Sequence, residues 1–153
     1  MSFKMKLSVA NIFTNVFVLY YYISSVMGAD SRQTMNLASL VELMGVAIII
    51  CGVVFAIFTG IIAAINHRDA ARGDDERDKL ISLHGDKAGY LTFVLFIVVA
   101  LIWVWNGTLS ERPFAINSAS LELNFLHFTL IGFLVSDVIK HARQVWLYQR
   151  GTM

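Results

Sequence analysis

Four long runs of apolar residues, separated by shorter polar stretches, dominate the pattern of this chain. Each run is close to or above the about 20 residues that a helix needs to cross the hydrocarbon core of a bilayer. We therefore predict an all-α membrane protein with four transmembrane helices in one domain. The predicted spans are residues 7–27, 43–65, 89–105 and 121–139. Polar residues interrupt the first run, so we expect a retained span rather than a cleaved signal peptide.

The composition supports a membrane protein. Apolar residues make up 57% of the chain and charged residues only 15%, whereas a soluble domain usually has about 25% charged residues. The single cysteine excludes an internal disulfide framework, and a net charge of +1 gives no basic surface for direct contact with nucleic acid. The chain has no motif of the phosphate-binding, nucleophile-elbow or zinc-protease type. We therefore predict no catalytic residue, no cofactor and no metal site.

Basic residues are divided unequally between the two sides of the predicted membrane. The side that holds both termini and the loop 66–88 has Lys4, Lys6, Arg68, Arg72, Arg77, Lys79, Lys87, Lys140, Arg143 and Arg150, and the other side has Arg32 and Arg112. Lys and Arg concentrate in cytoplasmic loops of membrane proteins. This distribution predicts that both termini and the loop 66–88 lie in the cytoplasm.

The loop 66–88 contains a helix signal of its own. Asp74 and Asp75 are candidate caps, and Leu80 and Leu83 share one helical face. We expect a short amphipathic cytoplasmic helix over residues 74–84. It either lies on the membrane surface or runs directly into the third span, with Gly85 as a hinge. Residues 140–148 are expected to extend the fourth helix into the cytoplasm.

Two patterns concern helix packing. Val41-Glu42-Leu43 and Gly52 recur 80 positions later as Leu121-Glu122-Leu123 and Gly132. Either two helix pairs form a parallel 2+2 repeat or two apolar helices resemble each other by chance. The second span also has small residues every four positions, which favours close helix packing within one molecule or between two copies. These small residues are Gly52, Ala56, Gly60 and Ala64.

A few polar residues inside the spans are candidates for ligand binding, because ionisable groups at that depth are costly. His127, with Asn124 three residues before it and Glu42 on the second span, could bind a lipid-soluble small molecule or an ion. Alternatively, His127 is uncharged and hydrogen-bonded to a neighbour such as Asn15 or Glu42. Haem is disfavoured because no other span carries a histidine. Asp137 is expected to pair with Lys140 or His141, with a proton-relay role as the alternative.

The C-terminal half carries a resemblance to a known family. Residues 75–81 read DERDKLI, Gly89-Tyr90 opens the third span, and residues 148–151 read YQRG. Over residues 74–151 the chain resembles small bacterial four-helix inner-membrane proteins of unknown function, which carry D-E-R-D/E-x-x-I before the third span and often Y-R-R-G at the end. Gln149 departs from that pattern. The resemblance implies a bacterial inner-membrane location and at most an association with small helix-turn-helix regulators.

These observations give three functional hypotheses. The first is a regulatory or accessory membrane protein without chemistry of its own, whose charged helix start contacts a soluble or membrane partner. The residues expected to face that partner are Asp75, Glu76, Arg77, Asp78 and Lys79. The second is binding or transport of a lipid-soluble small molecule or ion within the helix bundle. The third is a membrane redox subunit. Assembly into a homo-oligomer is compatible with all three.

Overall fold

The computed structural model describes residues 3–31, 36–67, 75–108, 115–116 and 120–150, and its long elements are all helices. They are α1 (Phe3–Ser31), α2 (Leu37–Ile65), α4 (Glu76–Trp105) and α5 (Leu121–Arg150). Each is long and apolar enough to cross a membrane, which confirms the predicted all-α architecture with four helices able to span. At 1.5 Å per residue each helix is about 45 Å long, so polar turns continue it beyond the apolar stretch.

Side-chain caps fix where α2 and α4 begin. The Asn36 side chain accepts a hydrogen bond from the Ser39 amide, and the Ser39 hydroxyl accepts one from the Asn36 amide, both at 2.9 Å. Asp75, one of the two expected caps, accepts a hydrogen bond from the Asp78 amide at 2.6 Å. These bonds satisfy amides that the first helical turn leaves without partners.

The segment before the third span is not a separate helix. α4 runs without interruption from Glu76 to Trp105, so the helix that follows the cap continues directly into the span. The hinge expected at Gly85 is wrong, because Gly85 is helical, buried and packed against the side chain of Gln144. The predicted C-terminal extension of α5 is confirmed, since that helix reaches Arg150. The extension gives the first turns of α4 a surface to pack on, with Tyr148 bonded to Asp78 and Gln144 against Gly85.

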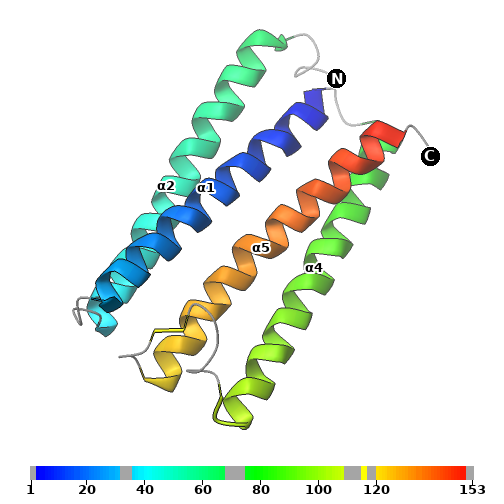
Figure 1. The fold of residues 1–153 in the computed structure, drawn as a ribbon. Coiled ribbons are helices and arrows are strands. Elements are labelled where there is room, and N and C mark those ends of the chain that lie inside the picture. The colour runs from blue at the N-terminus through cyan, green and yellow to red at the C-terminus, as the bar shows by residue number, and fades with distance from the viewer. Residues whose placement is uncertain (1–2, 32–35, 68–74, 109–114, 117–119, 151–153) are drawn as a thin grey trace.

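The helices lie in the order α2, α1, α5, α4 (Figure 1). α5 packs along both α1 and α4, and α1 also packs along α2. α2 touches α5 only lightly. α5 is therefore the central element that connects the α1–α2 pair to α4.

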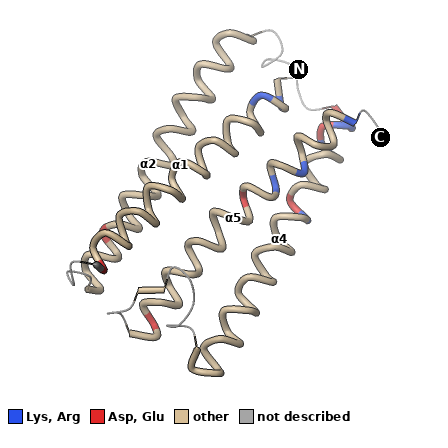
Figure 2. The backbone as a smooth tube through the Cα atoms, in the orientation of Figure 1, with Lys and Arg blue, Asp and Glu red and all other residues tan. Residues whose placement is uncertain are grey.

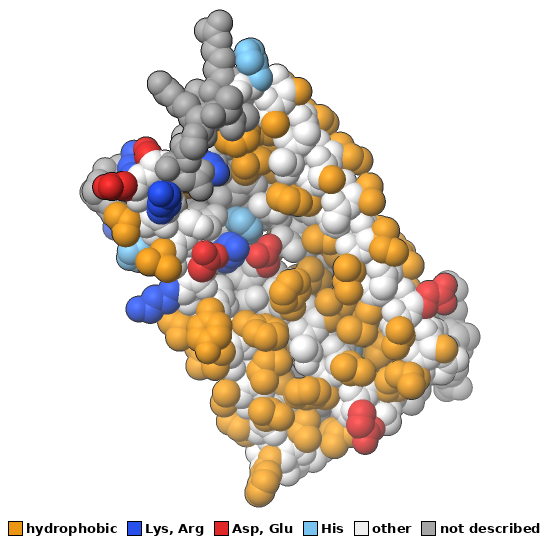
Figure 3. Space-filling model, turned by 180° about the vertical axis from the view of Figure 1, so that it is seen from behind, with side chains coloured by type: hydrophobic (Ala, Val, Ile, Leu, Met, Phe, Trp, Pro, Cys, Tyr) orange, Lys and Arg blue, Asp and Glu red, His pale blue; other side chains and the backbone are white. Residues whose placement is uncertain are grey.

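Burial in this fold runs opposite to hydrophobicity. α2 is the most apolar helix, yet its only buried residues are Leu40 and Ala47. α5 is among the least apolar, yet it has the most buried residues, polar ones included. Hydrophobic side chains instead cover much of the outer surface (Figure 3). This is the pattern expected in lipid, where apolar side chains gain little by turning inward and polar ones must find partners.

The start of α1 and the end of α5 lie at the same end of the molecule. Ser8 on α1 bonds to Gln144 on α5, Lys6 on α1 bonds to Asn66 after α2, and Tyr148 on α5 bonds to Asp78 on α4. These contacts bring together the start of α1, the end of α2, the start of α4 and the end of α5. The described Lys and Arg residues gather toward this end (Figure 2), which we call the basic end.

The arrangement gives no support to the parallel 2+2 repeat. A repeat that matches α1 with α4 and α2 with α5 would make matching helices pack in matching ways. Instead α1 and α5, which are not equivalent in such a repeat, form the contact between the two pairs. The two matching glycines also differ, because Gly52 has open space around it whereas Gly132 faces the ring of Phe96.

Close packing through small residues occurs on α4 rather than on the predicted face of α2. A Cβ atom on Gly89 would lie 2.9 Å from Lys140 Cβ and 3.1 Å from the Ser136 carbonyl oxygen. Gly85, one turn earlier, faces Gln144 equally closely. The four small residues on α2 are all exposed, so they do not pack within one molecule: Gly52, Ala56, Gly60 and Ala64.

The first testable consequence concerns this contact. Gly89→Ala should lower the free energy of unfolding by about 1–3 kcal/mol, because the new methyl group meets the backbone of α5. The matched control is Gly45→Ala, where a Cβ meets nothing within 4 Å. The control should be neutral or stabilise by up to about 1 kcal/mol, the helix-propensity gain of alanine. Reversible unfolding in detergent, followed by circular dichroism, measures both; equal effects at the two positions would contradict the α4–α5 packing.

Candidate functional site

The interface between α1 and α5 contains three polar pairs, which we call the polar seam. The Ser8 hydroxyl donates to Gln144 Oε1 at 2.9 Å, Asn15 Nδ2 donates to Asp137 Oδ2 at 2.7 Å, and the Tyr22 hydroxyl lies 2.9 Å from His127 Nδ1. Ser8, Asn15 and Tyr22 are seven residues apart and thus lie on one face of α1. Their partners follow α5 in the opposite direction, as antiparallel helices require.

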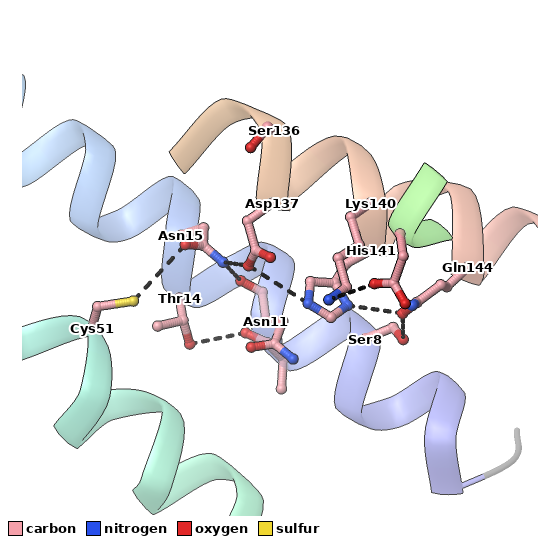
Figure 4. A network of polar contacts seen from close by, with 12 residues as sticks. Ser8, Asn11, Thr14, Asn15, Cys51, Ser136, Asp137, Lys140, His141 and Gln144 are labelled. Atoms are coloured by element: carbon pink, nitrogen blue, oxygen red, sulfur yellow. Dashed lines mark hydrogen bonds and ion pairs between the residues drawn. The ribbon is translucent and has the colours of Figure 1, made fainter. Parts of the chain in front are cut away.

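The middle pair is the most connected (Figure 4). Asp137 Oδ2 also lies 3.6 Å from His141 Nε2, and Asn15 Nδ2 donates to the carbonyl of Asn11 at 2.9 Å. The Cys51 thiol of α2 lies 3.9 Å from Asn15 Oδ1. A carboxylate inside an apolar helix bundle is therefore held by groups from both α1 and α5.

Of the two partners predicted for Asp137, the structure has His141 and not Lys140. Lys140 points to α4 and pairs with Asp86, with 2.8 Å between Nζ and Oδ1. Asp86 also accepts a hydrogen bond from Ser82 at 3.4 Å. The reason is the tight α4–α5 contact, which brings the carboxylate of Asp86 within reach of Lys140 across the interface.

The bonds of His141 define where its protons must be. His141 Nδ1 lies 2.9 Å from Gln144 Oε1, and an amide oxygen can only accept, so this bond requires a proton on Nδ1. Burial lowers the pKa of His141 below its usual value, which favours the neutral ring with its proton on Nδ1.

A polar pocket of about 200 Å³ opens next to these residues at the basic end. All four helices contribute to its wall, and most of the contributing side chains can form hydrogen bonds. The lining residues are Lys4, Leu7, Ser8, Asn11, Phe55, Asp78, Ser82, Lys140, His141, Gln144 and Tyr148. Two ammonium groups, three hydroxyl groups, two amides and an imidazole thus converge on one space, while the Asp78 carboxylate is already engaged by the Tyr148 hydroxyl at 2.9 Å.

The structure does not bring the predicted ligand-binding residues together. His127 is fully buried and lies 2.9 Å from the Tyr22 hydroxyl, which fits the alternative of a hydrogen-bonded histidine, with Tyr22 as the neighbour rather than the suggested Asn15 or Glu42. Asn124 is also fully buried, with its side chain bonded to the N–H (2.7 Å) and the carbonyl (3.0 Å) of Ile116. Glu42 is exposed on α2. Asn124 therefore anchors the segment before α5, and the three residues form no common site.

The residues expected to face a partner are mostly accessible. Asp75, Glu76, Arg77 and Lys79 are exposed at the start of α4. Asp78 is the exception, because it is half-buried and bonded to Tyr148. Leu80 and Leu83, which share one face, are exposed as well.

Sequence reasoning missed most members of the polar seam, although one signal for it was present. Asn11, Thr14 and Asn15 are among the polar residues that interrupt the first apolar run, and they give it a mildly polar face. Adding Ser8 and Tyr22 would have extended that face over four turns. On α5, Asp137, His141, Gln144 and Tyr148 follow one another at spacings of three or four residues, which marks a second polar face.

Comparisons with known proteins give no further guide to the site. No family model matches the chain, and neither a curated protein nor a solved structure is significantly similar to it. The resemblance inferred from residues 74–151 therefore stays a prediction.

The central pair of the polar seam can be tested by a double-mutant cycle with Asn15→Ala and Asp137→Ala. We expect a coupling energy of about 0.5–2 kcal/mol, at or above the usual value for polar pairs between membrane helices. The matched control combines Asn15→Ala with Thr92→Ala. The Thr92 hydroxyl bonds only to its own helix, at the Ala88 carbonyl, so these two effects should add. Additive behaviour of Asn15 and Asp137 in unfolding titrations would show that the contact has no energetic weight.

Proposed function

We propose that this protein is a membrane protein without chemistry of its own, and that it binds a lipid-soluble molecule carrying an acidic group. The observation that supports the proposal is the polar pocket at the basic end, where side chains from α1, α4 and α5 converge on one space. Membrane binding sites are typically concave, largely apolar and equipped with a few oriented polar groups. This site replaces the combination of His127, Asn124 and Glu42 expected from the sequence.

The charges of the pocket favour an acidic group. Lys4 and Lys140 contribute two ammonium groups, whereas Asp78 is the only carboxylate among the described residues of the lining. The ion pair between Lys140 and Asp86 is partly solvent-exposed, with side-chain exposures of 33% and 51%. Exposed ion pairs contribute about 0–1 kcal/mol, so an acidic ligand can recruit Lys140 at little cost.

The proposal includes the location of the pocket in the cell. The excess of Lys and Arg at the basic end supports an orientation with this end, and both chain termini, in the cytoplasm. The motif resemblance supports a bacterial inner membrane. The ligand would then enter the pocket from the cytoplasmic half of the bilayer.

A pair of probes with the same alkyl chain tests the proposal. Dodecyl phosphate should bind to the purified protein in neutral detergent, and dodecanol, which lacks the acidic group, should bind far more weakly. Lys4→Gln combined with Lys140→Gln should lower the affinity for dodecyl phosphate at least about tenfold, because each charged hydrogen bond contributes about 1.5–3 kcal/mol. Isothermal titration calorimetry measures both effects.

The matched control is Lys79→Gln, which removes a charge from the same end of the molecule but from an exposed position outside the pocket. This variant should bind dodecyl phosphate as the unmodified protein does. A loss of affinity equal to that of the double variant would mean that net charge, not the pocket, attracts the probe.

A second candidate function is docking of a protein partner on the first turns of α4, in keeping with an accessory or regulatory role. The supporting observation is that charged and apolar side chains are exposed together there, with Leu83 at 62% exposure. Contacts between Asp78 and Tyr148 and between Asp86 and Lys140 hold this part of α4 against α5. A partner would thus meet a rigid surface that needs no ordering on binding.

Photo-crosslinking in cells tests this second candidate. A photoreactive amino acid at Leu83 should give one discrete protein adduct, and Arg77→Ala should reduce its yield severalfold. The same amino acid at Gly60, exposed on α2, serves as the control and should not give that adduct. An adduct yield that Arg77→Ala leaves unchanged would rule out recognition of the charged first turn of α4.

A further inference from the structure

An apolar pocket of about 130 Å³ lies between α1, α2 and α5, farther from the basic end than the polar pocket. Val18 of α1, Ala47 and Ile48 of α2, and Leu130 and Leu134 of α5 line it. Gly52 forms part of its rim, and a side chain at that position would meet no atom within 4 Å. In a bilayer such a surface lies at the depth of the acyl chains.

The two pockets lie along the same face of each helix that they share. On α1, Lys4 and Asn11 line the polar pocket and Val18 lines the apolar one, at intervals of seven residues. On α2, Phe55 and Ile48 are seven residues apart and line the polar and the apolar pocket, respectively. Residues seven apart lie on nearly the same side of an α-helix.

The same interval recurs on α5. Leu134 lines the apolar pocket, and His141 and Tyr148 line the polar one. Along three helices the polar pocket at the basic end and the apolar pocket toward the middle of the molecule thus follow one another on one face, and we call this surface the groove.

The hydrogen-bonded pair of Asn15, which is buried, and Asp137, whose side chain is 29% exposed, lies between the two parts. By helical position, Asn15 falls between Asn11 and Val18 on α1, and Asp137 falls between Leu134 and His141 on α5. The Asp137 carboxylate at this position repels an acidic head group that moves past it toward the apolar part of the groove. An acidic head group is therefore favoured at the basic end, and only an uncharged chain is favoured beyond it.

We infer that this groove binds one glycerophospholipid, with its phosphate at Lys4 and Lys140 and one acyl chain beside Gly52 and Leu134. The inference rests on the proposed function and names its ligand class. The spread of donors in the polar pocket favours a phosphate over a carboxylate, because a phosphate offers more oxygens to ammonium and hydroxyl groups that approach from different helices.

The position of the acyl chain can be read out by photo-crosslinking. The probe is phosphatidic acid with a diazirine in the middle of one chain, mixed into phosphatidylcholine vesicles that contain the full-length protein. After irradiation, peptide mass spectrometry should find adducts concentrated on residues 47–52 and 130–134. Adducts spread evenly over the outer surface of α2 would show ordinary boundary lipid and overturn the inference.

Two matched variants separate the head group from the chain. Gly52→Leu fills the apolar part of the groove and should lower the yield of groove adducts about tenfold, a change of about 1.4 kcal/mol. Gly60→Leu is the control, because it adds the same side chain to the same helix in open space outside the groove. Equal yields of groove adducts from Gly52→Leu and Gly60→Leu would overturn the inference. This includes an equal loss of adducts in both variants, which would indicate contact with a second copy through the small residues of α2.

The outcome for the proposed function is read separately. If the double variant Lys4→Gln with Lys140→Gln weakens binding of dodecyl phosphate but the lipid probe forms no adducts in the groove, the acidic site stands and the assignment of a phospholipid fails. If the double lysine variant changes neither measurement, both fail. Diazirine-labelled palmitic acid that gives groove adducts as readily as the phosphatidic acid probe would overturn the choice of phosphate.

Discussion

The structure depends on the need to pair polar groups in a surrounding that offers them no water. Asp137 and Asn15 lie within apolar helices, and each unpaired polar group there costs several kcal/mol. Their mutual hydrogen bond of 2.7 Å connects α1 to α5 at one register only. A shift by one turn in either direction would also separate Ser8 from Gln144 and Tyr22 from His127. The polar seam thus sets the register between α1 and α5. Apolar contacts specify such a register only weakly, because the apolar helix surfaces resemble the surrounding lipid.

Once α1 and α5 are aligned, the positions of the other helices follow from different forces. α4 lies against α5 because Gly85, Gly89 and Gly132 let backbone and side chains approach closely. α2 has no comparably close contact through a glycine, and its apolar surface is largely exposed, as is expected of a helix that can span a membrane. The result is an open arrangement in which α2 and α4 rise on either side of the α1–α5 interface. The polar pocket lies beside the polar seam, with Ser8 and Gln144 in its wall, so the contact that specifies the fold also positions the candidate site.

Hydropathy predicted the number of helices and their approximate positions, because the cost of burying charge in lipid acts on each segment separately. The cap at Asp75 was predictable for the same reason, since a cap depends on residues within one turn. The rotation of each helix was not predictable in this way. The small residues of α2 have the spacing of a packing face, yet α4 with Gly85 and Gly89 has the tight contact. A spacing shows that residues share a face, and it does not show what that face meets.

His127 illustrates the same limit at a single residue. Its type and depth marked it as a candidate ligand, but its role depends on Tyr22, which is 105 positions away in the sequence and reached only when α1 and α5 align. The groups placed to act on a ligand are those near the basic end, where polar side chains from several helices line one pocket. Lys4 and Tyr148 line it from near the ends of α1 and α5, and Lys140 lines it from about three turns before the end of α5. Function is therefore expected where the pairing that holds the helices together gives way to open space, and the buried polar residues that first attract attention serve the fold.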